Sequence, residues 1–565
     1  MTKRKNISHS DAALLLFAVI CLAVKLFLMK DVKIVALTTS GADDALMVHI
    51  AEQLTRLNWF GAYNQCTLVK GCFFPVFLGI SHLLHVDYIS FVQIFYAAAC
   101  LMFVLAIKPS LRFRAFPYII YILLLFNPIL ASSQVIQRVY RNSITPMQVL
   151  LIFGGYLGVY IRCAQRDKSW IKWLAIGGFG FLSLWLTRED AVWALPFILA
   201  ASLFIAIRLW KEFGKQSFKR ILSLASPFIC LLVCIKVIAL LNGLVYGIFT
   251  ENELTNSAFS DTMKALYAID AGEEQTPYVS VSREKLRMVY EVSPAMASIE
   301  PEMEAMMDKW SVMTGREEIN KEQKEVENGW FFWVLREAVA EKGYYTNGKD
   351  ANAFYEQAAS EINQAFADGR LEKQSAMPSA LMPPWKKGML GDLLLTMVQA
   401  ADYVSSYQDC YLLNDPSTDD GGDGIARFEW ISGRKATATN SDSAGSAYAL
   451  ENAAMSQLAD IWSLAAIPVK WLGRACFLVL VILFFLRKLD SKESALLLGL
   501  TGLLGGLLCL YGGVAYNELR SCWSITYMYL SGAYPMAEAF HLLSIAGICQ
   551  WGYERFSDRI QKSNQ

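Results

Sequence analysis

The stretch YISFVQIFYAAACLMFVLAI, residues 88–107, runs for twenty residues without a charged side chain. A helix of about 20 apolar residues crosses the roughly 30 Å hydrocarbon core of a bilayer. Similar runs recur on both sides of it, and we count ten, so the predicted fold class is a polytopic α-helical membrane protein. The predicted spans are residues 12–29, 88–107, 116–132, 147–163, 171–187, 191–208, 221–246, 467–486, 495–516 and 525–551.

Composition agrees with a bilayer environment. Of the 565 residues, 55% are apolar and 18% are charged, and the mean hydropathy is +0.32. The 51 basic and 51 acidic residues cancel, which argues against a nucleic-acid partner. The 12 cysteines form no CxxC pairs, which argues against zinc. A disulfide between Cys66 and Cys72 stays open, since it depends on an oxidising surrounding.

The basic residues alternate between the ends of the predicted spans. Because basic loop residues stay in the cytoplasm, both termini are expected on the cytoplasmic side of the cell membrane. Three domains follow: a membrane module 1–249 with a first outer loop 30–87, an inserted, mainly helical extracytoplasmic domain 250–466, and C-terminal spans with a cytoplasmic tail 467–565. The inward basic residues are Lys3, Arg4, Lys5, Lys108, Arg112, Arg114, Arg162, Arg166, Lys168, Lys172, Lys211, Lys215, Lys219, Arg220, Arg487, Lys488, Lys492, Arg555, Arg559 and Lys562.

The first outer loop holds the most informative polar motif. In DDALMVHIAEQL, residues 43–54, two adjacent acids, Asp43 and Asp44, open a predicted helix. One interpretation is structural: Asp43 caps the helix and Asp44 complements its dipole. The other is functional, because the motif is followed by YNQCTLVKGCFFPVFLGI, residues 63–80, a polar segment that leads into a short membrane-surface helix.

These motifs resemble the GT-C superfamily of integral membrane glycosyltransferases, which includes oligosaccharyltransferases, protein O-mannosyltransferases and lipid A aminoarabinose transferases. QRVYRNSITP, residues 137–146, and WLTREDAVWALP, residues 185–196, resemble polar signatures of bacterial members. The resemblance covers residues 1–250. It implies a GT-C-like fold in the inner membrane of a bacterium. It also implies an enzyme that transfers a sugar from a polyprenyl-phosphate-linked donor to a glycan, lipid or protein acceptor on the outer face, with inversion at the anomeric carbon.

The resemblance also implies roles for individual residues. An acceptor hydroxyl loses its proton as it attacks, so Asp44 or Asp43 is expected to be the general base. The donor phosphate needs fixed cations, and the candidates are Arg138, Arg141, Arg188 and Lys70. The structural alternative for these arginines is contact with lipid headgroups or salt bridging to Glu189 and Asp190.

A divalent metal stays open as a cofactor, without support from the residues. Many family members carry a second acid in the second outer turn, where this chain has Asn142, which cannot supply a negative charge. Glu189 and Asp190 are candidate substitutes, or else caps of the next helix. The remaining candidate site residues are His49 and Tyr140.

Two other classes of function compete. A transporter or flippase for a lipid-linked or envelope precursor would place charges inside the membrane. Here Lys25, Lys236 and Arg474 are expected near span ends, where their side chains reach the interface. A surface-binding protein would work through residues 250–466. In that domain the aromatic side chains of Trp330, Trp333 and Tyr345 either stack on sugars or form the core.

Overall fold

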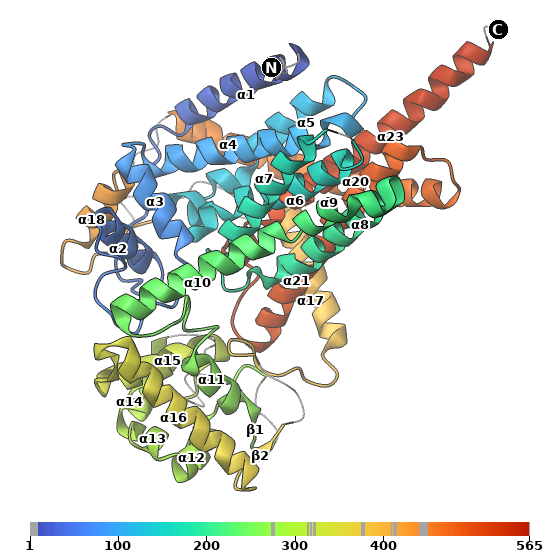
Figure 1. The fold of residues 1–565 in the computed structure, drawn as a ribbon. Helices are drawn as coiled ribbons and strands as arrows, with labels where there is room; N and C mark the ends of the chain where they lie inside the picture. Colours follow the sequence, from blue (N-terminus) through green and yellow to red (C-terminus); the bar gives the residue numbers. More distant parts are fainter. Residues whose placement is uncertain are drawn as a thin grey trace.

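The computed structural model is a helical membrane protein. It describes residues 9–563 except 166, 273–276, 314–315, 317–318, 320–323, 375–378, 408–409, 411–414 and 440–449. Four of the basic residues that are predicted to face the cytoplasm therefore lie outside the described part: Lys3, Arg4, Lys5 and Arg166. Both chain ends lie at the side of the helical bundle away from a small helical lobe (Figure 1).

The bundle supplies the apolar spans. Six described segments are long and apolar enough to cross a membrane: Ser10–Leu28, Tyr88–Ser110, Arg141–Arg162, Ala191–Tyr246, Ala453–Phe485 and Ser491–Arg520. They hold seven of the ten predicted runs, and the other three form helices that are too short or too polar to qualify, so the count of ten stays a prediction. The bundle helices are α1 (His9–Leu28), α4 (Tyr88–Ile107), α5 (Phe116–Leu125), α6 (Thr145–Arg162), α7 (Ser169–Trp185), α8 (Leu195–Phe213), α9 (Phe218–Ser223), α10 (Ser226–Tyr246), α20 (Leu450–Phe485), α21 (Ser491–Arg520) and α23 (Ala533–Ser563).

Glycines bring α6 and α7 into backbone contact. A Cβ added at Gly155 of α6 would lie 2.3 Å from the backbone of Gly177 on α7. Small residues at such positions let apolar helices approach closely, which gains packing contacts where lipid tails already satisfy the hydrophobic effect. The loops at the ends of α6 and α7 are held together in this way.

The first part of the inserted stretch forms the separate lobe (Figure 1). A small antiparallel sheet in the lobe pairs β1 (Ile269–Asp270) with β2 (Glu372–Lys373). Trp333 and Tyr345 are each 7% exposed, so both are core residues of this lobe. The lobe helices are α11 (Ala258–Ala268), α12 (Arg283–Val292), α13 (Pro294–Ala297), α14 (Glu300–Met313), α15 (Asn328–Glu341), η8 (Tyr344–Thr346) and α16 (Gly348–Ala367).

The second part of that stretch packs against the membrane module instead. Helix α17 (Leu390–Ser406) lies along α21, α20 and α23, and α18 (Gly424–Ser432) packs on α2 (Asp44–Thr55) and α3 (Phe73–Leu83). Residues 250–466 therefore do not pack as one body. The sequence does not predict this division, because polar residues on α17 keep its mean hydropathy below that of a membrane span.

Lys25 lies where we did not expect it. Its side chain is fully buried, and Nζ donates to the carbonyl of Leu125, the last residue of α5. The last carbonyls of a helix have no partner within the helix, so a buried lysine satisfies one of them here. The expectation that Lys25 reaches the membrane interface is wrong.

Candidate functional site

Nine of the ten candidate residues meet in one place, which we call the polar cluster. They come from the first loop, from the turn that precedes α6 and from the turn that follows α7. The tenth candidate, His49, lies elsewhere. The polar cluster consists of Asp43, Asp44, Lys70, Arg138, Tyr140, Arg141, Arg188, Glu189 and Asp190.

The chain around Arg138 is fixed by an extended piece of the first loop. The amide of Val35 donates to the carbonyl of Gln137 at 2.9 Å, and Val35 pairs with Arg138 as a parallel bridge. The hydroxyl of Tyr88 donates to the Arg138 carbonyl at 2.8 Å. These bonds hold the guanidinium of Arg138 over the start of α2.

Asp44 and Arg138 form a buried pair. Asp44 is fully buried, and Nε of Arg138 donates to its Oδ1 at 3.0 Å while Nη2 donates to Oδ2. Burial raises the pKa of Asp44, and the Arg138 guanidinium opposes that shift. Because both carboxylate oxygens are engaged and shielded from solvent, Asp44 is suited to position Arg138 rather than to accept a proton from a substrate.

Asp43 is the more open acid. It occupies the N-cap position of α2, but its side chain makes no cap bond. Instead Oδ1 accepts from the Tyr140 hydroxyl at 2.7 Å and lies 3.1 Å from Nζ of Lys70. The side chain is 35% exposed, and among the described residues Oδ2 accepts no hydrogen bond. Asp43 therefore stands at the N-cap position, as the structural interpretation predicts, but its side chain does not cap α2.

The charge environment makes Asp43 a strong acid in this state. Burial acts to raise the pKa of its carboxyl, but the Lys70 ammonium and the Tyr140 hydroxyl outweigh it and hold that pKa well below the usual value. Asp43 is therefore a carboxylate at neutral pH. It becomes a better proton acceptor only when Lys70 is turned away or neutralised.

The other two arginines are also paired with acids. Nη1 of Arg141 donates to both oxygens of Glu189, at 2.9 and 2.6 Å, and Nε donates to the Tyr140 hydroxyl at 3.1 Å. Arg188 donates to Asp190 at 2.7 and 2.9 Å. Asp190 makes no cap bond to the following turn. The salt-bridge alternative for Arg141 and Arg188 is therefore what these contacts show.

Arg188 ties the polar cluster to the C-terminal spans. Its Nη1 donates to the carbonyl of Met528 at 2.8 Å, and its guanidinium lies 5.7 Å from the ring of Tyr529. Sequence reasoning gave neither residue a role, since a backbone carbonyl and a single tyrosine carry no pattern.

The donor set does not fit a divalent cation. Each acid of the polar cluster already faces a cation: Asp43 faces Lys70, Asp44 faces Arg138, Glu189 faces Arg141 and Asp190 faces Arg188. Across the part of the chain that the structure describes, no three His, Cys, Asp or Glu side chains group as a metal site. Cys66 and Cys72 are free thiols.

His49 lies apart from the polar cluster. It lines a small cavity between α2 and α18, together with Glu52, Asp420 and Arg427. Burial and the Arg427 charge lower its pKa. The structure gives His49 no contact with Asp43 or Asp44 among its described hydrogen bonds.

A second buried charge network joins the lobe to the first loop. Arg336 of α15 is fully buried, forms an ion pair with Glu253 and donates from Nε to the carbonyl of Gln65 at 2.7 Å. The hydroxyl of Tyr63 donates to the same glutamate. The sequence contains no signal for this network, because its members lie far apart in the chain.

Gly71 is where the first loop meets the turn after α7. Its amide donates to Glu189 at 3.1 Å, and a Cβ would lie 2.2 Å from the Leu186 carbonyl oxygen. We expect Gly71→Ala to cost about 1–3 kcal/mol, because backbone atoms cannot yield cheaply. Thermal unfolding of the purified protein measures this. Gly41→Ala is the control, since nothing lies within 4 Å of a Cβ there; equal stability of the two variants would contradict the packing.

Comparison with known proteins finds no matching family model, no matching curated protein and no matching solved structure.

Proposed function

We propose that the polar cluster transfers a sugar from a polyprenyl-phosphate-linked donor to an acceptor hydroxyl at the extracytoplasmic face. The observation that carries the proposal is Asp43. One oxygen of its carboxylate is held by Lys70 and Tyr140, and the other is unengaged among the described residues. The side chain is partly exposed, and the positive charges of Lys70, Arg141 and Arg138 act on it. The GT-C-like fold belongs to the same proposal.

The proposed chemistry is a single displacement. The acceptor hydroxyl donates a hydrogen bond to Oδ2 of Asp43 and gives up its proton as its oxygen attacks the anomeric carbon. A new glycosidic bond forms on the face opposite the leaving group, and the bond between the anomeric carbon and the phosphate oxygen breaks. The electron pair leaves with the lipid phosphate, so the anomeric configuration inverts.

Cations of the polar cluster would bind the leaving phosphate. Because each is paired with an acid, a bound phosphate has to compete with a carboxylate. The ion pair of Lys70 and Asp43 is expected to separate most easily, because Lys70 offers only one ammonium group and Asp43 is 35% exposed. When Lys70 turns to the phosphate, the pKa of Asp43 rises, so donor binding also prepares the base.

The pH dependence of activity tests this coupling. Asp43 must be ionised to act, so activity is lost as the pH falls through its pKa. Lys70→Met removes the main charge that lowers that pKa, so the acid limb of the kcat/KM profile is expected to move to higher pH. The measurement is sugar transfer in membranes across a pH series. Lys349→Met, on the exposed start of α16, should leave the acid limb in place. An unshifted limb in Lys70→Met would contradict the coupling.

One observation favours transport as a second candidate. Beside the buried Lys25, the amide of Asn127 donates to Glu538 at 2.5 Å and to the Tyr407 hydroxyl at 2.9 Å, all within the bundle. Ionisable groups inside a membrane bundle often mark a translocation path. Uptake of a labelled lipid-linked sugar by proteoliposomes, lost in Glu538→Gln and retained in Asp43→Asn, would support transport over transfer.

A further inference from the structure

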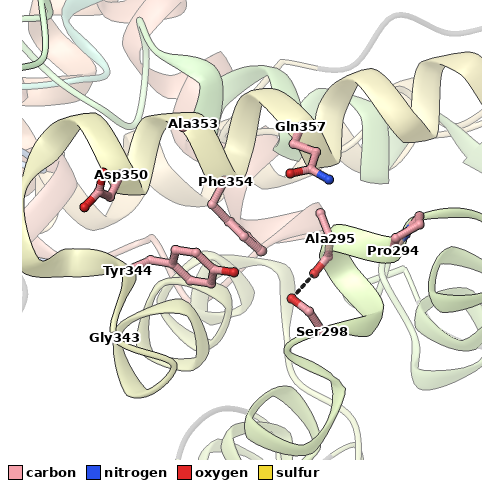
Figure 2. Close-up of a pocket in the computed structure, with 9 residues that line it drawn as sticks. All are labelled: Pro294, Ala295, Ser298, Gly343, Tyr344, Asp350, Ala353, Phe354 and Gln357. Atoms are coloured by element: carbon pink, nitrogen blue, oxygen red, sulfur yellow. Dashed lines mark hydrogen bonds between the residues drawn. The ribbon is translucent and has the colours of Figure 1, made fainter.

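A cavity that lies outside the polar cluster opens on the lobe. It measures about 450 Å³, the size of a small-ligand site, and opens between α13, η8 and α16 (Figure 2). Nothing in the proposed transfer step uses it. The lining residues are Pro294, Ala295, Ser298, Gly343, Tyr344, Asp350, Ala353, Phe354 and Gln357.

Two aromatic rings form one wall of this cavity. Tyr344 and Phe354 have ring centroids 4.8 Å apart with 36° between their planes. Phe354 is buried, which fixes the wall, whereas Tyr344 is only partly buried and presents its ring beside the open space (Figure 2). Among the described contacts the Tyr344 hydroxyl has no hydrogen-bond partner. Such a ring offers an apolar face and a polar tip to a ligand.

Polar groups surround the aromatic wall. Asp350 and Gln357 lie on the α16 side, and the Ser298 hydroxyl lies opposite them (Figure 2). Gln357 donates to Glu361 at 2.8 Å, and Asp350 accepts from Asn347 at 2.7 Å, so both side chains are oriented before any ligand arrives. An apolar wall with a few oriented polar groups is the general form of a small-molecule site.

The charge of the lining selects against anions. Among the described residues that line the cavity there is no lysine, arginine or histidine, and the charged one is Asp350. A phosphate or a uronic acid would therefore meet repulsion without a counter-ion. A neutral ligand rich in hydroxyl groups satisfies both halves of the site: its C–H face packs on Tyr344 and its hydroxyls bond to the carboxylate, amide and hydroxyl.

The cavity also adjoins the contact between the lobe and the first loop. The next residue along, Tyr345, stacks on Tyr63 of the first loop with centroids 5.8 Å apart. Gly348 at the start of α16 packs so closely on Ile248 that a Cβ would lie 2.6 Å from its side chain. The lobe is thus fastened to the same loop that carries Asp43.

We propose that this cavity binds a neutral saccharide, and that the saccharide is part of the acceptor glycan. The assignment to the acceptor rests on the proposed transferase function, whereas saccharide binding itself does not. Binding of the acceptor saccharide in this cavity would make the acceptor a glycan rather than a simple lipid or a protein side chain.

Saturation-transfer NMR on the full-length protein in lipid nanodiscs tests the proposal. The probes are four neutral oligosaccharides: maltohexaose, cellohexaose, mannohexaose and chitohexaose. At least one is expected to bind, and Gln357→Ala should weaken it about tenfold, since one hydrogen bond to the sugar is lost. Gln364→Ala is the matched control: it lies on the same helix, is exposed, and donates to an acid four residues on at the same 2.8 Å.

The outcomes separate the two proposals. Binding that is weakened by Gln357→Ala, unchanged by Gln364→Ala and unchanged by Asp43→Asn supports a saccharide site distinct from the polar cluster. Absence of binding by all four probes, or equal effects of the two glutamine variants, overturns the site. If the site binds as expected but wild-type membranes transfer no sugar, the transferase proposal and the acceptor assignment fail while the saccharide site stands.

Discussion

Asp43→Asn is expected to lower sugar transfer by about 10²–10⁴-fold, the usual contribution of a general base. The amide oxygen of asparagine still accepts the hydrogen bond that Tyr140 donates to Oδ1, so the start of α2 should keep its place. What is lost is the negative charge and the proton-accepting oxygen Oδ2. The measurement is the rate at which membranes that contain the variant label their acceptor from a lipid-linked sugar pool.

The control for that variant lies in the same loop. Asp31 is 50% exposed and 3.9 Å from Lys30, so Asp31→Asn should transfer at the wild-type rate. Asp43→Asn also removes the charge that Lys70 faces, so its midpoint of thermal unfolding is expected to fall. A cooperative unfolding transition above the assay temperature separates a chemical defect from a folding defect. Full activity of Asp43→Asn would remove the general base from the account.

Arg336→Met carries the largest expected effect on stability, a loss of about 3–5 kcal/mol. The variant leaves Glu253 as a buried charge whose remaining described partner is the Tyr63 hydroxyl. It also removes the bond to the carbonyl of Gln65 in the first loop. We expect a clearly lower midpoint of thermal unfolding for the purified protein, measured at a fixed lipid and detergent composition.

Two further variants interpret that result. Arg370→Met removes an ion pair with Asp368 that is about half exposed, and it should cost less than about 1 kcal/mol. Adding Glu253→Gln to Arg336→Met should recover part of the loss, because the unpaired buried charge is gone. If Arg336→Met were as stable as Arg370→Met, the buried network would not hold the lobe to the first loop.

The membership of the polar cluster could be predicted from the sequence, and its pairing could not. Hydropathy and basic-residue asymmetry place Asp43, Arg138 and Arg188 on loops at one side of the membrane, so their meeting follows from the order of the spans. Which acid faces which cation depends on a π-helical turn at Ser133–Gln137 and on the bridge from Val35 to Arg138. Neither leaves a pattern in the residues.

The burial of charged side chains could not be predicted from the sequence either. Hydropathy gives the position of Lys25 along an apolar run but not the face of the helix on which it lies. It also does not show that the last carbonyl of α5 lies beside the Lys25 side chain. Arg336 has the same problem in the lobe, where its partners Glu253 and Gln65 come from distant parts of the chain. Tertiary packing, rather than local sequence, decides whether such side chains reach water.

Release of free polyprenyl phosphate from the donor tests most directly whether the polar cluster transfers a sugar. Purified wild-type protein in nanodiscs is supplied with the lipid extract and the envelope glycan fraction of the cells that make it, so that donor and acceptor are both present. Free polyprenyl phosphate is then measured by mass spectrometry over time. We predict that free polyprenyl phosphate accumulates with the wild type and stays at the level of empty nanodiscs with Asp43→Asn. Equal accumulation in the two proteins, or none above empty nanodiscs for the wild type, would contradict sugar transfer at the polar cluster.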